Sequence, residues 1–399
     1  MDVELDPAEA GFDAGRLARI DRHFVRYVDD GRLAGWLAVV ARRGKVVHVA
    51  QAGVRDVESG APVEHDTVWR IYSMTKPITS VAAMMLYEEG AFELKQPVAD
   101  FIPAFADARV FTGGSELKPV TEPLTEPVRM WHLLTHTSGL TYGFHWAHPV
   151  DAIYRRKGYE WSTPPGLDLA ACCEQWAAMP LLFQPGSEWN YGVSTDVLGR
   201  AVEVISGQTL DAFFRERIFA PLGMDDTGFT APAGRLATLY GPGLVRDDAL
   251  GELIMRAPDA FLGGGGLAST AADYQRFATM LLNEGELDGV RLLGARTVRY
   301  MGRNHLPGGA DLEQYGRPLF SETTYDGVGF GLGFSVVLDP AVNRVLSSPG
   351  ELAWGGAAST AFWIDRQEAI TVLFFTQMLP SSTYPLRTQL RQLVYQALV

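Results

Sequence analysis

The sequence predicts an α+β fold in which both ends of the chain contribute strands to one antiparallel sheet, with helices flanking it and a mostly helical block inserted. Strand-like apolar runs occur early, at residues 36–41, 46–52 and 68–72, and return late, at residues 329–338, 359–364 and 369–377. Between about residues 90 and 260 such runs are scarce, and helical patterns alternate with Pro/Gly-rich loops. The economical arrangement is one α/β unit made from both ends of the chain.

Each end of the chain also carries a helical pattern. Residues 13–29 place Leu17, Ile20, Phe24 and Val28 three or four positions apart, which is the spacing of an amphipathic helix. Residues 384–398 have the same kind of pattern. The first two strand-like runs are separated by a short turn that contains glycine, as in a hairpin. We therefore expect a hairpin and two terminal helices around the sheet.

The middle of the chain is expected to be helical. An apolar helix over residues 74–89 ends at Gly90. Further helices are expected at residues 130–134, 168–178, 195–206, 210–219, 270–283 and 295–301. The loops at 241–257 and 306–325 are polar and are expected to line or cover a site. We therefore expect residues 1–399 to form a single β-sheet-based unit with two subdomains. Residues 1–72 and 262–399 form an α/β subdomain, and residues 73–261 form a mostly helical subdomain.

Composition narrows the class of protein. The 399 residues are 47% hydrophobic and 20% charged, and the net charge is −13. An acidic surface repels nucleic acid and anionic lipid, so neither is an expected partner. The N-terminus has no signal-peptide pattern and no apolar run is long enough to span a bilayer. The two cysteines, Cys172 and Cys173, are adjacent and form no disulfide framework. A cytoplasmic protein is expected, and the oligomeric state stays open.

Ser73 and Lys76 form a Ser-x-x-Lys motif at the start of the predicted helix. Residues three apart share one helix face, so the amine can reach the hydroxyl and activate it as a nucleophile. The spacing alone is weak, because Ser115 and Lys118 repeat it. Pro119 follows that second pair and prevents a helix there. Context thus favours Ser73, with simple helix capping as the alternative.

Three further motifs accompany Ser73 in a fixed order. They are the run His132-Leu-Leu-Thr-His-Thr-Ser-Gly-Leu140, the segment Pro185-Gly186-x-x-Trp189-x-Tyr191, and Trp354-Gly355-Gly356. Together with the Ser-x-x-Lys motif, they resemble the β-lactamase-related serine hydrolases, which include class C β-lactamases, DD-peptidases and family VIII carboxylesterases. The resemblance covers nearly the whole chain and implies a serine β-lactamase-like (DD-transpeptidase-like) fold.

The resemblance also implies roles for individual residues. Ser73 is the nucleophile, and Lys76 and Tyr191 move its proton. The oxyanion hole consists of the backbone N–H groups of Ser73 and Ala357. Substrate-binding positions are expected at Trp354, Gly355, Gly356, Val193 and Tyr142. No cofactor and no metal are implied.

Two departures from the family pattern concern the substrate. Val193 stands where class C enzymes have the asparagine of Tyr-x-Asn, and Trp354 stands where they have the lysine of Lys-Thr-Gly. A tryptophan cannot hold a β-lactam carboxylate by charge, but it can pack on an acyl or alcohol group. The expected activity is hydrolysis of small or short-chain acyl esters, with weak β-lactam hydrolysis as a side reaction. The alternatives are acyl transfer, a β-lactamase or DD-peptidase activity, and an inactive protein that senses ligands.

Other candidate motifs have simpler explanations. His132 and His136 lack the third ligand of a metal site, and the resemblance assigns His136 to a structural turn. The run 263–266 lacks the residues of a phosphate loop, and its glycines are expected to let the chain pass close to the site. Ser194 is expected to cap the following helix. Four aromatic residues are candidates for the lining of an acyl pocket: Tyr142, Phe144, Trp146 and Trp161.

Overall fold

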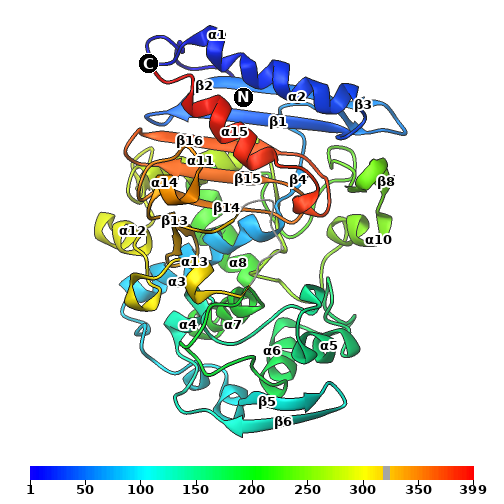
Figure 1. The fold of residues 1–399 in the computed structure, drawn as a ribbon, viewed down its shortest axis with the longest axis vertical. Coiled ribbons are helices and arrows are strands. Elements are labelled where there is room, and N and C mark those ends of the chain that lie inside the picture. The colour runs from blue at the N-terminus through cyan, green and yellow to red at the C-terminus, as the bar shows by residue number, and fades with distance from the viewer. Residues whose placement is uncertain (318–323) are drawn as a thin grey trace.

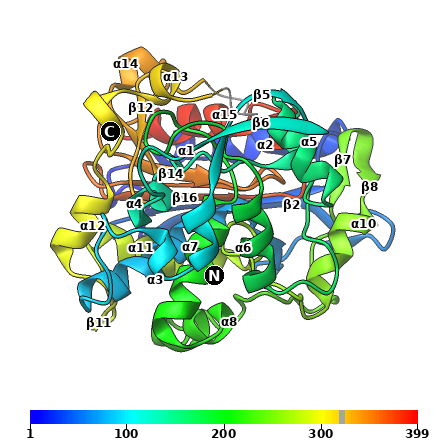
Figure 2. The ribbon, with the colours of Figure 1, turned by 90° about the horizontal axis from the view of Figure 1, so that it is seen from below.

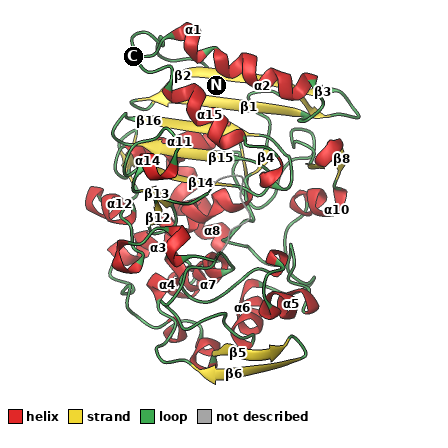
Figure 3. Cartoon of the chain, viewed as in Figure 1, coloured by secondary structure: helices red, strands yellow, loops and turns green. Residues whose placement is uncertain are grey.

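The computed structural model describes residues 1–317 and 324–399, and within them both ends of the chain build one eight-stranded antiparallel sheet (Figures 1 and 3). The strand order is β12-β13-β14-β15-β16-β1-β2-β3. The strands are β1 (Gly35–Arg42), β2 (Lys45–Asp56), β3 (Ala61–Pro62), β12 (Val328–Phe330), β13 (Ser335–Val337), β14 (Leu352–Gly355), β15 (Ala361–Asp365) and β16 (Ile370–Phe375). The first strand pairs with the last, with Val39 opposite Leu373. The predicted fold class is confirmed.

Strand β1 shows how this sheet is stabilised. Successive side chains of a strand point to opposite faces. Leu37 and Val39 pack into the large core that extends into the helical block, whereas Trp36 and Ala38 pack into the core beneath the terminal helices. All four side chains are buried. An uninterrupted apolar strand is therefore required here, because the sheet is covered on both faces.

Helices form a layer on each face of the sheet, as Figure 2 shows. One layer holds α1 (Ala14–Leu17), α2 (Arg19–Asp29) and α15 (Leu386–Tyr395). On the other face, α11 (Ala271–Leu282) contacts β15 and β16. The helical block that extends away from this face contains α3 (Thr75–Glu88), α4 (Met130–Leu134), α5 (Pro149–Arg156), α6 (Leu169–Ala178), α7 (Ser194–Ser206), α8 (Leu210–Phe214) and α9 (Ala220–Leu222) (Figure 1). Shorter helices are α10 (Asp248–Gly251), α12 (Ala295–Met301), α13 (Leu312–Tyr315) and α14 (Pro340–Asn343). No helix in the described ranges is both long and apolar enough to cross a membrane.

Several element boundaries differ from the prediction. The helix predicted at 13–29 is two helices that meet at Ala18, where Asp13 caps the first through the N–H of Arg16. The run 329–338 is the hairpin β12–β13, turned at Gly331 to Gly333, where Gly333 has φ +96°. The loop at 241–257 contains α10. Of the loop at 306–325, residues 318–323 lie outside the described chain.

Most of the short strands outside the main sheet were not predicted from the sequence; the exception is the strand Trp69–Arg70, which lies within the predicted run 68–72. Four two-stranded pairs lie outside the main sheet: β4 (Trp69–Arg70) with β9 (Ala268–Ser269), β5 (Arg109–Ser115) with β6 (Lys118–Pro123), β7 (Tyr240–Gly241) with β8 (Val245–Arg246), and β10 (Glu286–Leu287) with β11 (Val290–Arg291). The second Ser-x-x-Lys pair, Ser115 and Lys118, closes the β5–β6 hairpin far from the sheet (Figure 1). The division into subdomains at 72/73 and 261/262 stays a proposal.

Candidate active site

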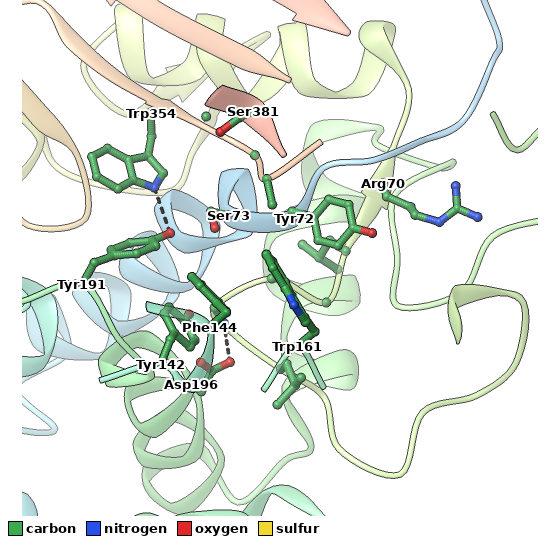
Figure 4. A pocket seen from close by; sticks show the side chains of 18 of the residues that line it. Arg70, Tyr72, Ser73, Tyr142, Phe144, Trp161, Tyr191, Asp196, Trp354 and Ser381 are labelled. Carbon is green, nitrogen blue, oxygen red and sulfur yellow. Dashed lines mark hydrogen bonds between the residues drawn. The ribbon is translucent and has the colours of Figure 1, made fainter. Parts of the chain in front are cut away.

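Ser73 lies at the junction between β4 and α3. The chain leaves β4, makes a 3-10 turn over Tyr72–Met74, and enters α3 at Thr75. Tyr72 adopts φ +43°, a left-handed conformation that is unusual for a tyrosine and redirects the chain just before the serine. Ser73 lines a cavity of about 770 Å³ (Figure 4). The predicted nucleophile is thus at the wall of a cavity large enough for a small-molecule ligand.

Lys76 lies one turn further along α3 and is buried, with 1% of its surface exposed. Its Nζ atom is 3.4 Å from Ser73 Oγ, 3.1 Å from Tyr142 Oη and 2.7 Å from the carbonyl oxygen of Gly264. An ammonium group has three N–H donors, and here each has an acceptor. A buried lysine is costly unless its charge is compensated, so a nearby anion is expected.

The anion is Asp196, in the first turn of α7. It is buried, and its Oδ1 accepts a hydrogen bond of 2.8 Å from the N–H of Gly264. The pKa of Asp196 is raised above its ordinary value, because burial outweighs the Lys76 cation and the surrounding donors, which lower it. Its partners are all donors, which suits a carboxylate and not a carboxylic acid. Asp196 was not among the predicted site residues, because its only signal in the sequence is a lone acidic residue on the apolar face of a helix.

Tyr142 connects the lysine to this carboxylate. Its hydroxyl accepts from Lys76 and donates to Asp196 (Figure 4). Burial, followed by the nearby Asp196 and Tyr191, raises the pKa of Tyr142 well above its usual value of 10. The phenol therefore keeps its proton and acts as a fixed bridge. Lys76, Tyr142, Asp196 and Gly264 form a closed ring of hydrogen bonds.

Tyr191 lies on the other side of the lysine. Lys76 Nζ is 4.4 Å from the centre of the Tyr191 ring, and the Tyr191 hydroxyl accepts a 3.3 Å hydrogen bond from Trp354 Nε1 (Figure 4). The backbone carbonyl of Tyr191 is held by His145 Nε2 at 2.7 Å. Burial lowers the pKa of His145, so this ring donates as a neutral imidazole. These contacts fix the phenol beside both the lysine and the cavity.

The Trp354-Gly355-Gly356 motif occupies the end of β14 and the turn that follows. All three residues line the cavity, together with Ala357. A side chain at Gly356 would come within 2.5 Å of the Ile71 carbonyl oxygen, so only glycine fits between this turn and the segment before Ser73. Ser73 and Ala357, the two residues predicted to form the oxyanion hole, therefore both lie at the cavity wall.

The structure brings most of the predicted site residues together, with two exceptions. Tyr142, Phe144 and Trp161 line the cavity, but Trp146 does not and is 67% exposed. Val193 does not contact the cavity, contrary to the prediction. It directly precedes α7 and is buried in the core, 4% exposed. The start of the helix turns this side chain away from the site.

Two other predictions concern polar residues near the site. Ser194 does not cap α7: the helix begins at this residue, and its hydroxyl contacts Ser138 Oγ at 2.8 Å. His136 is buried with φ +56°, and burial and the Lys76 cation lower its pKa well below 6.5. No group of three His, Cys, Asp or Glu residues that could hold a metal occurs in the part of the chain that the structure describes.

The glycine run 263–266 allows close packing of the hydrogen-bonded ring formed by Lys76, Tyr142, Asp196 and Gly264. A Cβ atom on Gly264 would lie 2.5 Å from Asp196 Oδ2, whereas one on Gly265 would meet nothing closer than 3.8 Å. Gly264 uses both its N–H and its carbonyl in the site. The expectation that these glycines let the chain pass close to the site is confirmed by this geometry.

The comparison with known families gives the same assignment as the geometry. The family model described as Beta-lactamase matches residues 20–396. The chain belongs to the β-lactamase family. Protein Rv1367c of Mycobacterium tuberculosis is 37% identical over 88% of each chain, and Esterase EstB of Burkholderia gladioli is 32% identical over 98% of this chain and 99% of its own. The predicted β-lactamase-like serine hydrolase is confirmed.

Solved structures of this family share the fold. The structure described as "EstCE1, a hydrolase with promiscuous acyltransferase activity" matches with a TM-score of 0.80 and 27% identity, covering 96% of this chain and 98% of its own. The β-lactamase-like fold therefore extends from the first helices to the last, as the sequence predicts.

Proposed function

We propose that this protein is a serine carboxylesterase that cleaves small or short-chain acyl esters through an acyl-enzyme on Ser73. The observation that carries the proposal is the position of Lys76, whose Nζ lies 3.4 Å from Ser73 Oγ while Tyr191 lies against its other side. An ester-hydrolase activity is further supported by relatives such as Esterase EstB. Membership of carboxylesterase family VIII stays part of the proposal.

The first half of the reaction forms the acyl-enzyme. The Lys76–Tyr191 pair enters the reaction with one proton fewer than an ammonium and a phenol together hold, and it accepts the single proton of Ser73 as Oγ attacks the ester carbonyl. The N–H groups of Ser73 and Ala357 stabilise the negative charge on the carbonyl oxygen. Tyr191 then protonates the leaving alcohol as the carbon–oxygen bond breaks. Trp354 orients the Tyr191 hydroxyl for this proton transfer.

The second half releases the acid. A water molecule in the cavity attacks the acyl carbonyl, and the same pair accepts its proton. Ser73 leaves and takes the proton back, so the enzyme returns to its starting state. The Lys76–Tyr142–Asp196 bridge keeps the buried charge balanced throughout, because Tyr142 retains its own proton.

Trp354 favours esters over β-lactams. The indole lies at the cavity wall, 8% exposed, at the position where the family's lactamases have a lysine. It presents an apolar surface and no charge for a substrate carboxylate. β-Lactam hydrolysis or a DD-peptidase activity would accordingly be weak side reactions.

Turnover of a chromogenic acetyl or butyryl ester tests the proposal. The Ser73→Ala protein should lose turnover, and Tyr191→Phe should lower kcat by about 10²- to 10⁴-fold, the range of general acid–base catalysis. Ser115→Ala is the matched control, because Ser115 has the same Ser-x-x-Lys spacing but lies in the β5–β6 hairpin. Wild-type turnover by Ser73→Ala would refute the mechanism.

Acyl transfer is the second candidate function. The cavity of about 770 Å³ leaves space for an acceptor alcohol beside a short acyl group, and EstCE1 is described as having promiscuous acyltransferase activity. Product analysis with and without an added alcohol separates transfer from hydrolysis.

An inactive ligand sensor is disfavoured by the intact cluster of Ser73, Lys76 and Tyr191. A small-molecule ester is the proposed ligand, and the adjacent buried cysteines Cys172 and Cys173 support a cytoplasmic location.

A further inference from the structure

Ser381 presents a hydroxyl group to the cavity that no other side chain or backbone group of the described chain uses. The residue lies in the segment between β16 and α15, is 5% exposed, and lines the cavity (Figure 4). Within the described residues its Oγ atom makes no hydrogen bond, and the atom is not enclosed by protein. A hydroxyl that is largely removed from water needs a hydrogen-bond partner. At this position the partner must come from the cavity.

The other polar side chains of the cavity wall that are buried to this extent already have partners within the protein. Arg70 donates to the Gly251 carbonyl, Asp196 accepts from the Gly264 N–H, Tyr191 accepts from the Trp354 indole, and Ser335 donates to the Ala353 carbonyl. Ser335 is the matched comparison, because it is also a serine of the wall, is 6% exposed, and holds its acceptor at 2.7 Å. In the described part of the wall, Ser381 is thus the buried polar group left open to a ligand.

The segment that carries Ser381 is fixed to the turn that contains Ala357. The N–H of Met378 donates to the Ala358 carbonyl at 3.2 Å. The hydroxyl of Ser359 donates to the Met378 carbonyl at 2.7 Å. These bonds hold the segment against the turn that is expected to form half of the oxyanion hole. A fixed polar group in the wall of a ligand cavity determines which ligands bind and how they are oriented.

We propose that Ser381 determines specificity by binding a hydroxyl group of the substrate, so that the preferred substrates are esters that carry a hydroxyl. A serine hydroxyl donates one hydrogen bond and accepts others, and an uncharged hydroxyl is its matching partner. A charged group would lose more hydration than one neutral hydrogen bond returns. The inference rests on the proposed esterase function and adds the substrate class. The hydroxyl can belong to the acyl or to the alcohol part, and two arms of the test separate these sources.

The activity test replaces the hydroxyl of the substrate by a methyl group of nearly equal size. The acyl arm compares ethyl 3-hydroxybutyrate with ethyl 3-methylbutyrate, and the alcohol arm compares 2-hydroxyethyl acetate with propyl acetate. Ser381→Ala should lower the ratio of kcat/KM for the hydroxyl over the methyl ester by about threefold to tenfold in one arm, as expected for one neutral hydrogen bond. Ser335→Ala is the control and should leave both ratios within about twofold, because its hydroxyl is used inside the protein.

A binding test keeps the proposal independent of turnover. In the Ser73→Ala background, the same four esters are titrated by the change in tryptophan fluorescence, since Trp354 lines the cavity. Adding Ser381→Ala should weaken the binding of at least one hydroxyl ester by about threefold or more relative to its methyl counterpart, whereas adding Ser335→Ala should not. Unchanged ratios in both arms together with unchanged binding would overturn the role of Ser381. Absence of ester turnover in the wild type with the binding effect intact would refute the esterase function alone.

Discussion

The Tyr142 hydroxyl lies between Lys76 and Asp196, accepting a hydrogen bond from the ammonium and donating one to the carboxylate. The bridge links the Lys76 ammonium to the Asp196 carboxylate, and Lys76 is the member of this pair that contacts Ser73. It gives the buried lysine a compensating charge while its remaining N–H groups face Ser73 and the Gly264 carbonyl. The site therefore depends on a carboxylate that takes no direct part in the reaction.

Asp196→Asn tests this dependence through turnover. The variant leaves the buried Lys76 without its compensating carboxylate and gives the N–H of Gly264 an uncharged acceptor, so kcat/KM should fall by about 10²-fold.

Tyr142→Phe is the companion variant, since it removes the bridge but keeps the carboxylate. Its loss of kcat/KM should be smaller than that of Asp196→Asn, because the carboxylate still compensates the charge of Lys76. Wild-type kcat/KM in Asp196→Asn would contradict the dependence of the site on this carboxylate.

Gly264→Ala should damage the site through geometry. Its Cβ would lie 2.5 Å from Asp196 Oδ2, so the carboxylate or the glycine segment must shift. Displacements of about 1 Å at a catalytic site can cost about 10²-fold in rate, and we expect a loss of this order in kcat. Gly265→Ala is the neighbouring control, with no atom closer than 3.8 Å to the added carbon. Equal losses in the two variants would contradict the close packing of Gly264 on Asp196.

Trp354→Phe should have a smaller effect. The variant keeps an aromatic wall but loses the hydrogen bond from Nε1 to the Tyr191 hydroxyl. A neutral hydrogen bond contributes about 1 kcal/mol, so kcat should fall by about fivefold while KM changes little. Steady-state kinetics on a butyryl ester measures both. A rise in KM with unchanged kcat would mean that Trp354 binds substrate and does not orient Tyr191.

The motifs in the sequence identify the reacting groups because each motif reflects a local constraint. The spacing of Ser73 and Lys76 needs only one helical turn, and the proline after Lys118 excludes the competing pair. The sheet was equally predictable, since apolar strands at both ends of the chain leave few other arrangements. The break between α1 and α2 at Ala18 was not, because neither glycine nor proline interrupts the periodicity there.

Residues that act through distant contacts were harder to identify. Asp196 belongs to the site because α7 packs on α3 and the run 263–266 passes between them, and no local pattern encodes that approach. Val193 illustrates the converse, since its place in a motif suggested a substrate contact but the start of α7 turns it into the core. Sequence motifs thus identified the candidate catalytic residues, whereas the carboxylate that compensates the charge of Lys76 could be identified only from the tertiary structure.

His132 provides a test of stability against pH. Burial lowers the pKa of His132 from 6.5 to about 3, so the folded protein keeps this ring neutral while the unfolded chain protonates it. Its contribution to stability is therefore complete above pH 6.5 and is lost as the pH falls towards 3. Between these two pH values, the free energy of unfolding falls by about 1.4 kcal/mol for each pH unit because of this one histidine.

His132→Asn should remove that slope. The wild type and the variant are compared by urea unfolding at pH 7.5 and pH 5, where the substituted amide can still accept the 2.9 Å hydrogen bond that the N–H of Arg129 donates to the histidine ring. The variant's free energy of unfolding should depend less on pH by about one proton. An identical pH dependence in both proteins would show that His132 is protonated in the folded state.

The central claim is that Ser73 carries the acyl group, and intact-protein mass spectrometry after brief mixing with an activated butyryl ester tests it most directly. We predict a mass increase of one butyryl group, located by peptide mapping on Ser73, in the wild type and in Ser115→Ala, and none in Ser73→Ala. Acylation of Ser73→Ala to the wild-type extent, or of a peptide without Ser73, would contradict the account.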